Sequence, residues 1–261
     1  MTMALTVLGG SAASVGTGQG CAGYLVASDT TRIMLDAGPG TLTQLRRHTD
    51  FRTLDAVVIS HLHVDHMLDT IAMRFSLAYN PVKADWRVPL WLPPGGIALY
   101  DQLAAVFATD DAPEAFFRQV FAVNEYDPDE PLAIGDLTLT FAPTVHFIDC
   151  WAVRLHPADG GDLFYSADTG PAADLAALAA GARVCVIEAT TPAGAESSLP
   201  FDRRGHLTAT EAGTMAATAG TSTLVLTHMF EEHNPSQSLA EASAVFTGEI
   251  VRAVPGVTVT W

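Results

Sequence analysis

The stretch His61-Leu62-His63-Val64-Asp65-His66 follows the apolar run 56–59, with only Ser60 between them, and is the most informative part of this chain. Side chains two positions apart on an extended backbone point the same way, so His61 and His63 can hold one ion together. Asp65 and His66 lie where the chain is expected to turn into a helix, close to a second ion position. Four metal-binding side chains within six residues, directly after a buried strand, predict a metal site.

Three polar residues in the second half of the chain follow apolar runs in the same way. They are His146, Asp168 and His228. Side chains that leave a sheet where its strands end can gather at one rim. We therefore expect these three residues to join the first cluster and complete its ligand set.

The seven candidate ligands divide into two sets that share one carboxylate. The first set is His61, His63 and His146, and the second is Asp65, His66 and His228. Asp168 has two carboxylate oxygens, so it can bridge the two ions and leave a shared position for water. Ligation by imidazole and carboxylate without thiolate favours two Zn²⁺ ions, although Mn²⁺ and iron accept the same donors.

Two further residues point to catalysis rather than to metal binding. His206 lies in a loop directly before an expected helix, and Glu188 ends an apolar strand. A hydrogen bond between them would fix the tautomer of the imidazole and raise its pKa, which suits a proton donor. The alternatives are a histidine on a surface loop and a glutamate in a salt bridge at a strand end.

Strand-like runs alternate with helical periodicity along the chain. The expected strands are 5–8, 23–27, 32–36, 56–59, 137–141, 151–155, 163–166, 184–188 and 223–227. The expected helices lie near 68–79, 171–180, 208–219 and 238–247. Thr208 and Glu211 form a capping box for the third helix, and Gly220 ends it. The turn at 127–129 separates two halves, about 1–130 and 131–261, of one α/β domain whose two βα layers face each other.

Composition limits the partners of this chain. Lys and Arg number 13 against 29 Asp and Glu, which gives a net charge of −16. Such a charge repels nucleic acid, whereas bound cations would dominate the field inside a site for a small substrate. Three scattered cysteines (Cys21, Cys150 and Cys185) suit reduced thiols in a cytoplasm. The chain shows no signal-peptide pattern and no membrane-spanning apolar run, so we expect a cytoplasmic protein.

One glycine-rich segment formally matches the dinucleotide-binding fingerprint. It reads Gly18-Gln19-Gly20-Cys21-Ala22-Gly23. That fingerprint requires a helix to follow, but the strand-like Tyr24-Leu25-Val26 follows instead. The sequence therefore argues against a Rossmann domain.

The ligand pattern resembles that of the metallo-β-lactamase superfamily, whose H-x-H-x-D-H motif corresponds here to His61 to His66. The resemblance extends from Val7-Leu8-Gly9 to the C-terminal strand. It implies a four-layer αβ/βα sandwich, with two mixed β-sheets face to face and helices outside. β-Lactam hydrolysis is not implied, because β-lactamases typically carry a cysteine ligand where this chain has Asp168 and usually lack a counterpart of His66.

Finer motifs resemble the ribonuclease Z-like phosphodiesterase branch of that superfamily. They are 165–170 (Tyr-Ser-Ala-Asp-Thr-Gly), 188–190 (Glu-Ala-Thr), 206–208 (His-Leu-Thr) and 226–228 (Leu-Thr-His). In that branch the residues that match His206 and Glu188 assist proton transfer to the leaving group. Ala167 stands where a glycine is usual, which leaves the aspartate ligand intact.

The interval between His146 and Asp168 is short, at 22 positions. In tRNA-processing ribonuclease Z enzymes this interval normally carries a long basic arm that clamps the tRNA. Together with the negative charge, the missing arm argues against tRNA maturation. The chain is most similar to the short bacterial members, some of which are cyclic nucleotide phosphodiesterases.

We therefore expect a binuclear metal phosphodiesterase that acts on a small phosphodiester, with a cyclic nucleotide as the leading candidate. Asp65 would orient the attacking water, and His206, supported by Glu188, would protonate the departing oxygen. One alternative is a lactone, thioester or carboxyl-ester hydrolase with the same metals. The others are a ribonuclease Z-like RNA 3′-processing nuclease and a non-enzymatic metal or ligand-sensing site.

Three apolar stretches have two interpretations each. The helical region 97–121 could belong to the core or form a lid over the site, and the core is favoured because aromatic stripes usually pack inside. Stretches 86–92 and 116–121 could serve a homodimer interface, as relatives are often dimers, or be buried within one chain.

Overall fold

Two seven-stranded β-sheets face each other in the computed structural model, which describes residues 2–108, 112–194 and 199–261. The first sheet runs, in spatial order, β14 (Thr258–Thr260), β1 (Ala4–Gly9), β2 (Gly23–Ala27), β3 (Arg32–Leu35), β4 (Ala56–Val58), β5 (Val88–Leu92) and β6 (Phe121–Glu125). The second runs β13 (Glu249–Arg252), β12 (Thr223–Thr227), β11 (Val184–Glu188), β10 (Leu163–Tyr165), β9 (Trp151–Pro157), β8 (Leu137–Pro143) and β7 (Leu132–Ile134).

Both sheets are mixed, and they are mixed in the same way. Strands β1 to β3 are antiparallel and β3 to β6 are parallel, while β7 to β10 are antiparallel and β10 to β13 are parallel. The chain crosses from the first sheet to the second between β6 and β7. The predicted turn at 127–129 lies in this crossing, so it separates the two sheets, and β14 later returns to pair with β1.

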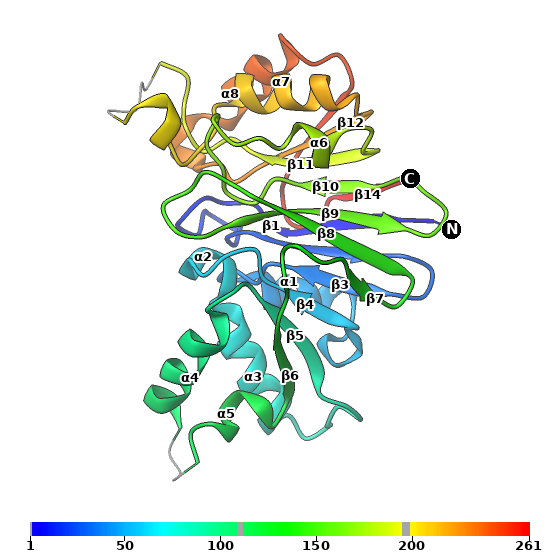
Figure 1. Ribbon diagram of the computed structural model, residues 1–261, viewed down its shortest axis with the longest axis vertical. Coiled ribbons are helices and arrows are strands. Elements are labelled where there is room, and N and C mark those ends of the chain that lie inside the picture. Colours follow the sequence, from blue (N-terminus) through cyan, green and yellow to red (C-terminus); the bar gives the residue numbers. More distant parts are fainter. Residues whose placement is uncertain (1, 109–111, 195–198) are drawn as a thin grey trace.

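Helices lie outside both sheets, as Figure 1 shows. The helices on the side of the first sheet are α1 (Thr41–His48), α2 (Val64–Met67), α3 (Asp69–Tyr79), α4 (Gly96–Phe107) and α5 (Ala115–Arg118). Those on the side of the second sheet are α6 (Ala176–Ala179), α7 (Ala209–Ala219) and α8 (Pro235–Ser243). Short 3₁₀ turns are η1 (Phe51–Thr53), η2 (Phe201–Arg203) and η3 (Glu231–His233). The expected αβ/βα sandwich is confirmed.

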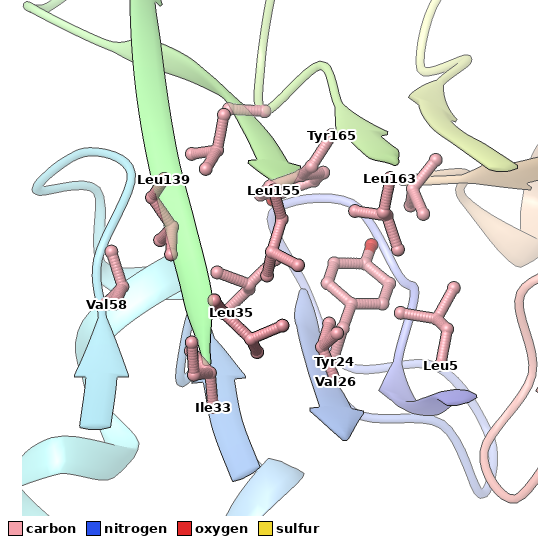
Figure 2. Packing of buried hydrophobic residues seen from close by; sticks show 14 of the residues in the cluster. Leu5, Tyr24, Val26, Ile33, Leu35, Val58, Leu139, Leu155, Leu163 and Tyr165 are labelled. Atoms are coloured by element: carbon pink, nitrogen blue, oxygen red, sulfur yellow. The ribbon is translucent and has the colours of Figure 1, made fainter. Parts of the chain in front are cut away.

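The buried apolar side chains form three clusters that follow these layers. Leu35 of the first sheet and Leu155 of the second point toward each other between the sheets, as Figure 2 shows. The other two clusters lie between each sheet and its own helices. In β11, Val186 faces the cluster between the sheets and Ile187 faces the helices. A strand buried on both faces reads as a continuous apolar run, which is why it was visible in the sequence.

The structure confirms several local predictions and corrects two. Thr208 and Glu211 form the capping box of α7, and Gly220 caps its C-terminus with φ 70°. A strand, not a helix, follows the glycine-rich fingerprint. The helix predicted over 171–180 is only the four residues of α6. The helix predicted over 238–247 begins earlier, because Pro235 occupies its first turn, where the fixed φ of proline suits a helix start.

The aromatic region 97–121 belongs to the core. Within its described residues, Tyr100, Phe116, Phe117 and Phe121 are buried against the first sheet, and residues 109–111 lie outside the description. The stretch 86–92 contains β5, whose alternate side chains are buried as well. Burial within one chain therefore accounts for most of the side chains considered for an interface, and a homodimer stays a prediction.

Candidate metal centre

The first group of candidate ligands lies at the carboxyl end of β4 and the start of α2. His61 comes three residues after β4, and His63 is the N-cap residue of α2 with an extended backbone (φ −68°, ψ 147°). Asp65 and His66 are in the single turn of α2 and are buried. The predicted change from extended chain to helix is present, and it sends the two pairs of side chains to neighbouring positions.

The second group comes from the facing sheet. His146, Asp168 and His228 lie in the loops that follow β8, β10 and β12, and Glu188 is the last residue of β11. Strands β10, β11 and β12 are parallel and in register, with Glu188 opposite Thr227. Their carboxyl ends therefore meet at one edge, and the structure brings every candidate ligand to that edge.

One set of ligand atoms surrounds a first position. It consists of His61, His63, His146 and Asp168, whose donor atoms all lie within 4.8 Å of one another. His146 Nε2 lies 2.9 Å from His63 Nδ1 and 3.6 Å from Asp168 Oδ2. His61 Nε2 lies 3.7 Å from the same Asp168 oxygen.

A second set shares Asp168 through its other oxygen. It consists of Asp65, His66, Asp168 and His228, again within 4.8 Å. His228 Nε2 lies 3.2 Å from both His66 Nε2 and Asp65 Oδ2, and Asp168 Oδ1 lies 3.3 Å from His66 Nε2. One carboxylate thus faces both sets, as the sequence predicted for a bridging aspartate.

The donor atoms have the chemistry of a cation site. Buried imidazole nitrogens face one another at about hydrogen-bond distance, although only a proton or a cation can make such contacts favourable. Within the described chain, His61 Nε2 and Asp168 Oδ1 are buried and make no hydrogen bond. Buried polar atoms are normally satisfied, so their orientation toward a common point fits a bound divalent ion.

Hydrogen bonds behind the ligands orient four of the imidazoles. In each of them Nδ1 contacts an oxygen atom: Ser60 Oγ for His61 (3.0 Å) and Asp36 Oδ2 for His66 (2.8 Å). The partner of His146 is the Gly205 carbonyl (2.9 Å), and that of His228 is Thr190 Oγ1 (2.7 Å). Donation through Nδ1 leaves the lone pair of Nε2 free toward the centre. Such partners fix the tautomer that a metal ion requires.

Asp36 is a site residue that the sequence argument did not identify. Its buried carboxylate accepts hydrogen bonds from the Ser60 amide (2.7 Å), the Ser60 hydroxyl (2.8 Å), His66 Nδ1 (2.8 Å) and the Tyr165 hydroxyl (2.6 Å). Asp36 therefore orients His66 directly and His61 through Ser60. Its sequence signal was the one used for Asp168, a carboxylate at the end of an apolar run.

The electrostatics prepare most of these groups for metal binding. Burial lowers the pKa of His61, His63 and His146, which keeps these imidazoles neutral. Burial would raise the pKa of Asp168, but the neighbouring His228 and His66 hold it well below the usual value. Neutral imidazole and ionised carboxylate are the forms that ligate metals.

His66 differs from the other histidines. Burial opposes its charge, but the carboxylates of Asp168 and Asp36 outweigh burial and raise its pKa well above 6.5. A cation that binds at the second position must therefore displace a proton, so metal affinity there depends on pH.

His206 and Glu188 form the predicted pair. His206 Nδ1 lies 2.9 Å from Glu188 Oε1, and Glu188 is buried while His206 is partly exposed. The carboxylate is held by the amides of Thr169 (2.8 Å) and Thr190 (3.2 Å). Burial would lower the pKa of His206, but Glu188 raises it to about 9. His206 is therefore not a free histidine on a surface loop, while the catalytic role of this ion pair at the end of β11 stays a prediction.

A cavity of about 370 Å³ opens over residues of both ligand sets and the His206 ring. Its described lining contains two carboxylates and no Lys or Arg. The lining residues are Ala13, His63, Val64, Asp65, His146, Phe147, Asp168, Thr190, His206, His228 and Phe230. A cavity of this size accepts a small molecule.

The fold and this centre define a metal-dependent hydrolase with an αβ/βα sandwich, and comparison with known proteins gives the family. A family model described as a β-lactamase superfamily domain matches residues 31–229. A relative from Mycobacterium leprae, named "Uncharacterized protein ML1173", is 32% identical to this chain over 259 residues, which is 99% of this chain and 88% of the relative. The chain belongs to the metallo-β-lactamase superfamily.

Other relatives carry more specific names. A probable metallo-hydrolase of Bacillus subtilis, YhfI, is 28% identical over 259 residues, covering 97% of this chain and 98% of that protein. Its crystal structure superimposes with a TM-score of 0.87 at 25% identity, with both chains fully covered. Ribonuclease Z of Thermobifida fusca is 29% identical over 304 residues, covering 97% of this chain and 92% of the relative.

Among the described residues, none of the helices combines the length and apolar character needed to cross a membrane.

Proposed function

We propose that this chain is a binuclear metal phosphodiesterase that hydrolyses a small phosphodiester, with a cyclic nucleotide as the leading candidate. The observation that carries the proposal is the His206–Glu188 pair on the wall of the cavity that holds the ligand clusters. An acid beside the metals serves a reaction whose leaving group is a poor alkoxide, such as a sugar oxygen.

The proposed ligands are His61, His63, His146 and Asp168 at the first position, and Asp65, His66, His228 and Asp168 at the second. Two divalent ions, with Zn²⁺ the best match to these donors, would neutralise phosphate charge and lower the pKa of a water molecule. Asp65 accepts the Ala13 amide hydrogen at 2.9 Å, which keeps its carboxylate at the edge of the cavity, where it can orient that water. The second ligand set contains two carboxylates, Asp65 and Asp168, whose negative charges would offset the charge of a bound divalent ion. The site would therefore have little net positive charge with which to attract a polyanion.

His206 is the proposed proton donor. Its Nδ1 is bonded to Glu188, so the other ring nitrogen, Nε2, remains for the departing oxygen of the substrate. Glu188 stabilises the charged imidazolium before the transfer and keeps the ring in one orientation. Protonation of the leaving oxygen removes the negative charge that would otherwise develop there.

Two observations favour a small substrate over RNA. The interval between His146 and Asp168 consists of β9, a turn and β10, with no room for a tRNA-clamping arm. The net charge is −16, and no Lys or Arg is among the described residues that line the cavity. The relative named ribonuclease Z supports phosphodiester chemistry, whereas these two features favour a substrate with a single negative charge.

A substrate panel on protein of measured metal content tests the proposal. We expect hydrolysis of 3′,5′-cyclic AMP or cyclic GMP and little hydrolysis of a lactone, a thioester or a precursor tRNA. His206→Ala should keep its metals, lose most activity on cyclic nucleotides and lose less on bis(p-nitrophenyl) phosphate, whose leaving group needs no proton. Faster turnover of the lactone or thioester than of any phosphodiester would refute the proposal.

A further inference from the structure

One side chain beside the candidate centre has no role in the chemistry described above. Phe147 directly follows His146, and 57% of its surface is exposed, although it lies in a cavity wall. Its ring contacts two rings of the centre, with centroids 5.1 Å from His146 and 5.7 Å from His206. Ligand pockets are lined mainly by apolar and aromatic side chains, so an exposed ring in a cavity wall is placed to contact a bound molecule.

The position of Phe147 is built into the local backbone. A Cβ atom on Gly205 would lie 2.8 Å from Cε2 and Cζ of the Phe147 ring, and 3.2 Å from His146 Nδ1. Any other residue at 205 would therefore displace the ring. The absence of a side chain at Gly205 lets Phe147 lie against the loop that carries His206 and line the cavity there.

Two more apolar side chains belong to the same cavity wall. Val64 lies between the ligands His63 and Asp65 and is 60% exposed, and Phe230 comes two residues after His228. These apolar groups therefore share the wall with five of the candidate ligands, with His206 and with Ala13 and Thr190. No Lys or Arg is among the described residues of the wall, and the positive charge of His206 is paired with Glu188, so these apolar side chains offer the part of the substrate next to the phosphate apolar contact rather than charge.

We propose that Phe147, with Val64 and Phe230, forms a subsite that binds the base of a nucleotide by stacking on the exposed Phe147 ring. The inference rests on the proposed function and adds to it the class of substrate, a phosphodiester that carries an aromatic base. Stacking on one aromatic side chain is sequence-tolerant, because every base offers a π-face. The subsite should therefore accept purines and pyrimidines with modest differences in affinity.

Binding measured without turnover tests the subsite. Equilibrium dialysis would compare AMP with ribose 5-phosphate, which has the same phosphate and sugar but no base, on the metal-loaded protein. Wild type should bind AMP about 10-fold more tightly than ribose 5-phosphate, from the usual strength of one stacking contact. Phe147→Leu should lose most of that preference by weakening AMP alone, and Phe147→Trp should keep it. Tyr79→Ala, which removes an exposed aromatic ring from α3, is the matched control and should bind both ligands as wild type does.

Three results would overturn the subsite: equal affinity of wild type for the two ligands, retention of the AMP preference in Phe147→Leu, or equal weakening of both ligands by that substitution. Kinetics with 3′,5′-cyclic AMP on the same preparations separate this inference from the proposed function. Hydrolysis without a preference for the base overturns the subsite and leaves the phosphodiesterase standing. A preference that depends on Phe147 without hydrolysis supports the subsite and overturns the phosphodiesterase.

Discussion

Replacing Glu188 with glutamine removes the charge that keeps a proton on His206, while the side chain keeps its size. Burial disfavours the imidazolium ion, but the Glu188 carboxylate 2.9 Å away outweighs burial and raises the pKa of His206 from 6.5 to about 9. In Glu188→Gln, burial, the largest influence, is opposed by Asp168 but no longer by Glu188, so the pKa should fall to about 6.5 or lower.

The size of the effect follows from the protonated fraction of His206. A proton donor contributes below its pKa, and its contribution is lost as the pH rises through that value. At pH 8, about 90% of His206 is protonated with a pKa of 9, against about 3% with a pKa of 6.5. Glu188→Gln should therefore lose about 30-fold in kcat/KM at that pH and much less near pH 5.5. Bound cations would lower the pKa of His206 in wild type and in Glu188→Gln together. The prediction therefore concerns the separation between the pH profiles of the two proteins, about 2.5 pH units.

The same substitution has a structural cost. The Glu188 carboxylate also accepts the amide hydrogens of Thr169 (2.8 Å) and Thr190 (3.2 Å) through its two oxygens. A glutamine has one acceptor oxygen, so one of these buried amides loses its partner at a cost of about 1–3 kcal/mol. Thermal denaturation measures this loss and shows whether the variant is still folded under the assay conditions.

The assay is kcat/KM against pH, from about 5.5 to about 9.5, for wild type and Glu188→Gln at equal metal content. Cyclic AMP, with its alkoxide leaving group, should show the shifted high-pH limb. Bis(p-nitrophenyl) phosphate should not, because nitrophenolate departs without a proton. If the variant keeps the wild-type limb for cyclic AMP, or changes equally for both substrates, the pair formed by His206 and Glu188 does not act as the acid.

Three further predictions concern the metals. Asp168→Ala should lose both metal and activity, because one carboxylate faces both ligand sets, and retention of two ions by elemental analysis would contradict this bridging role. Asp36→Asn should weaken metal binding about 10- to 100-fold in a chelator competition, because the amide can no longer accept from His66, Ser60 and Tyr165 together. Removal of the metals by a chelator should lower the Tm, since the buried cluster binds ions only when folded, and an unchanged Tm would argue against ions at this centre.

The candidate site could be predicted from the sequence because its residues break a strong pattern. Asp168, Glu188 and His228 each lie at or just beyond the end of a strand whose residues are buried, whereas His146 follows β8, in which buried and half-buried residues alternate. Continuous apolar runs mark strands that are covered on both faces, so a polar residue at such an end is conspicuous. The proximity of those ends follows from the parallel register of β10, β11 and β12, which the alternation of strands and helices indicates.

Other parts of the fold gave weaker signals. Strand β5 contains Pro89 and alternates buried with half-buried residues, so its sequence does not read as a central strand. Helix α1 follows Gly40 without a side-chain cap, and β14 is only three residues long. Such elements form because tertiary contacts hold them, which single-sequence propensity does not register.

The geometry of the centre depends on backbone conformations that residue identities do not reveal. Among the described non-glycine residues, five have positive φ, and four of them adjoin or belong to the centre: Ala13 (46°), Asp36 (55°), Ala167 (48°) and His228 (53°). Each such conformation costs on the order of 1 kcal/mol or more and persists only where surrounding contacts enforce it. Ala167 shows why a glycine is usual before the aspartate, since the left-handed turn that directs Asp168 between the two ligand sets suits glycine best. Thr190 holds His228 through both its ring nitrogen (2.7 Å) and its carbonyl (2.8 Å), so the strained backbone and the imidazole are fixed together. The H-x-H-x-D-H motif thus supplies donor atoms, but strained turns from both sheets set the spacing at which those atoms can share two ions.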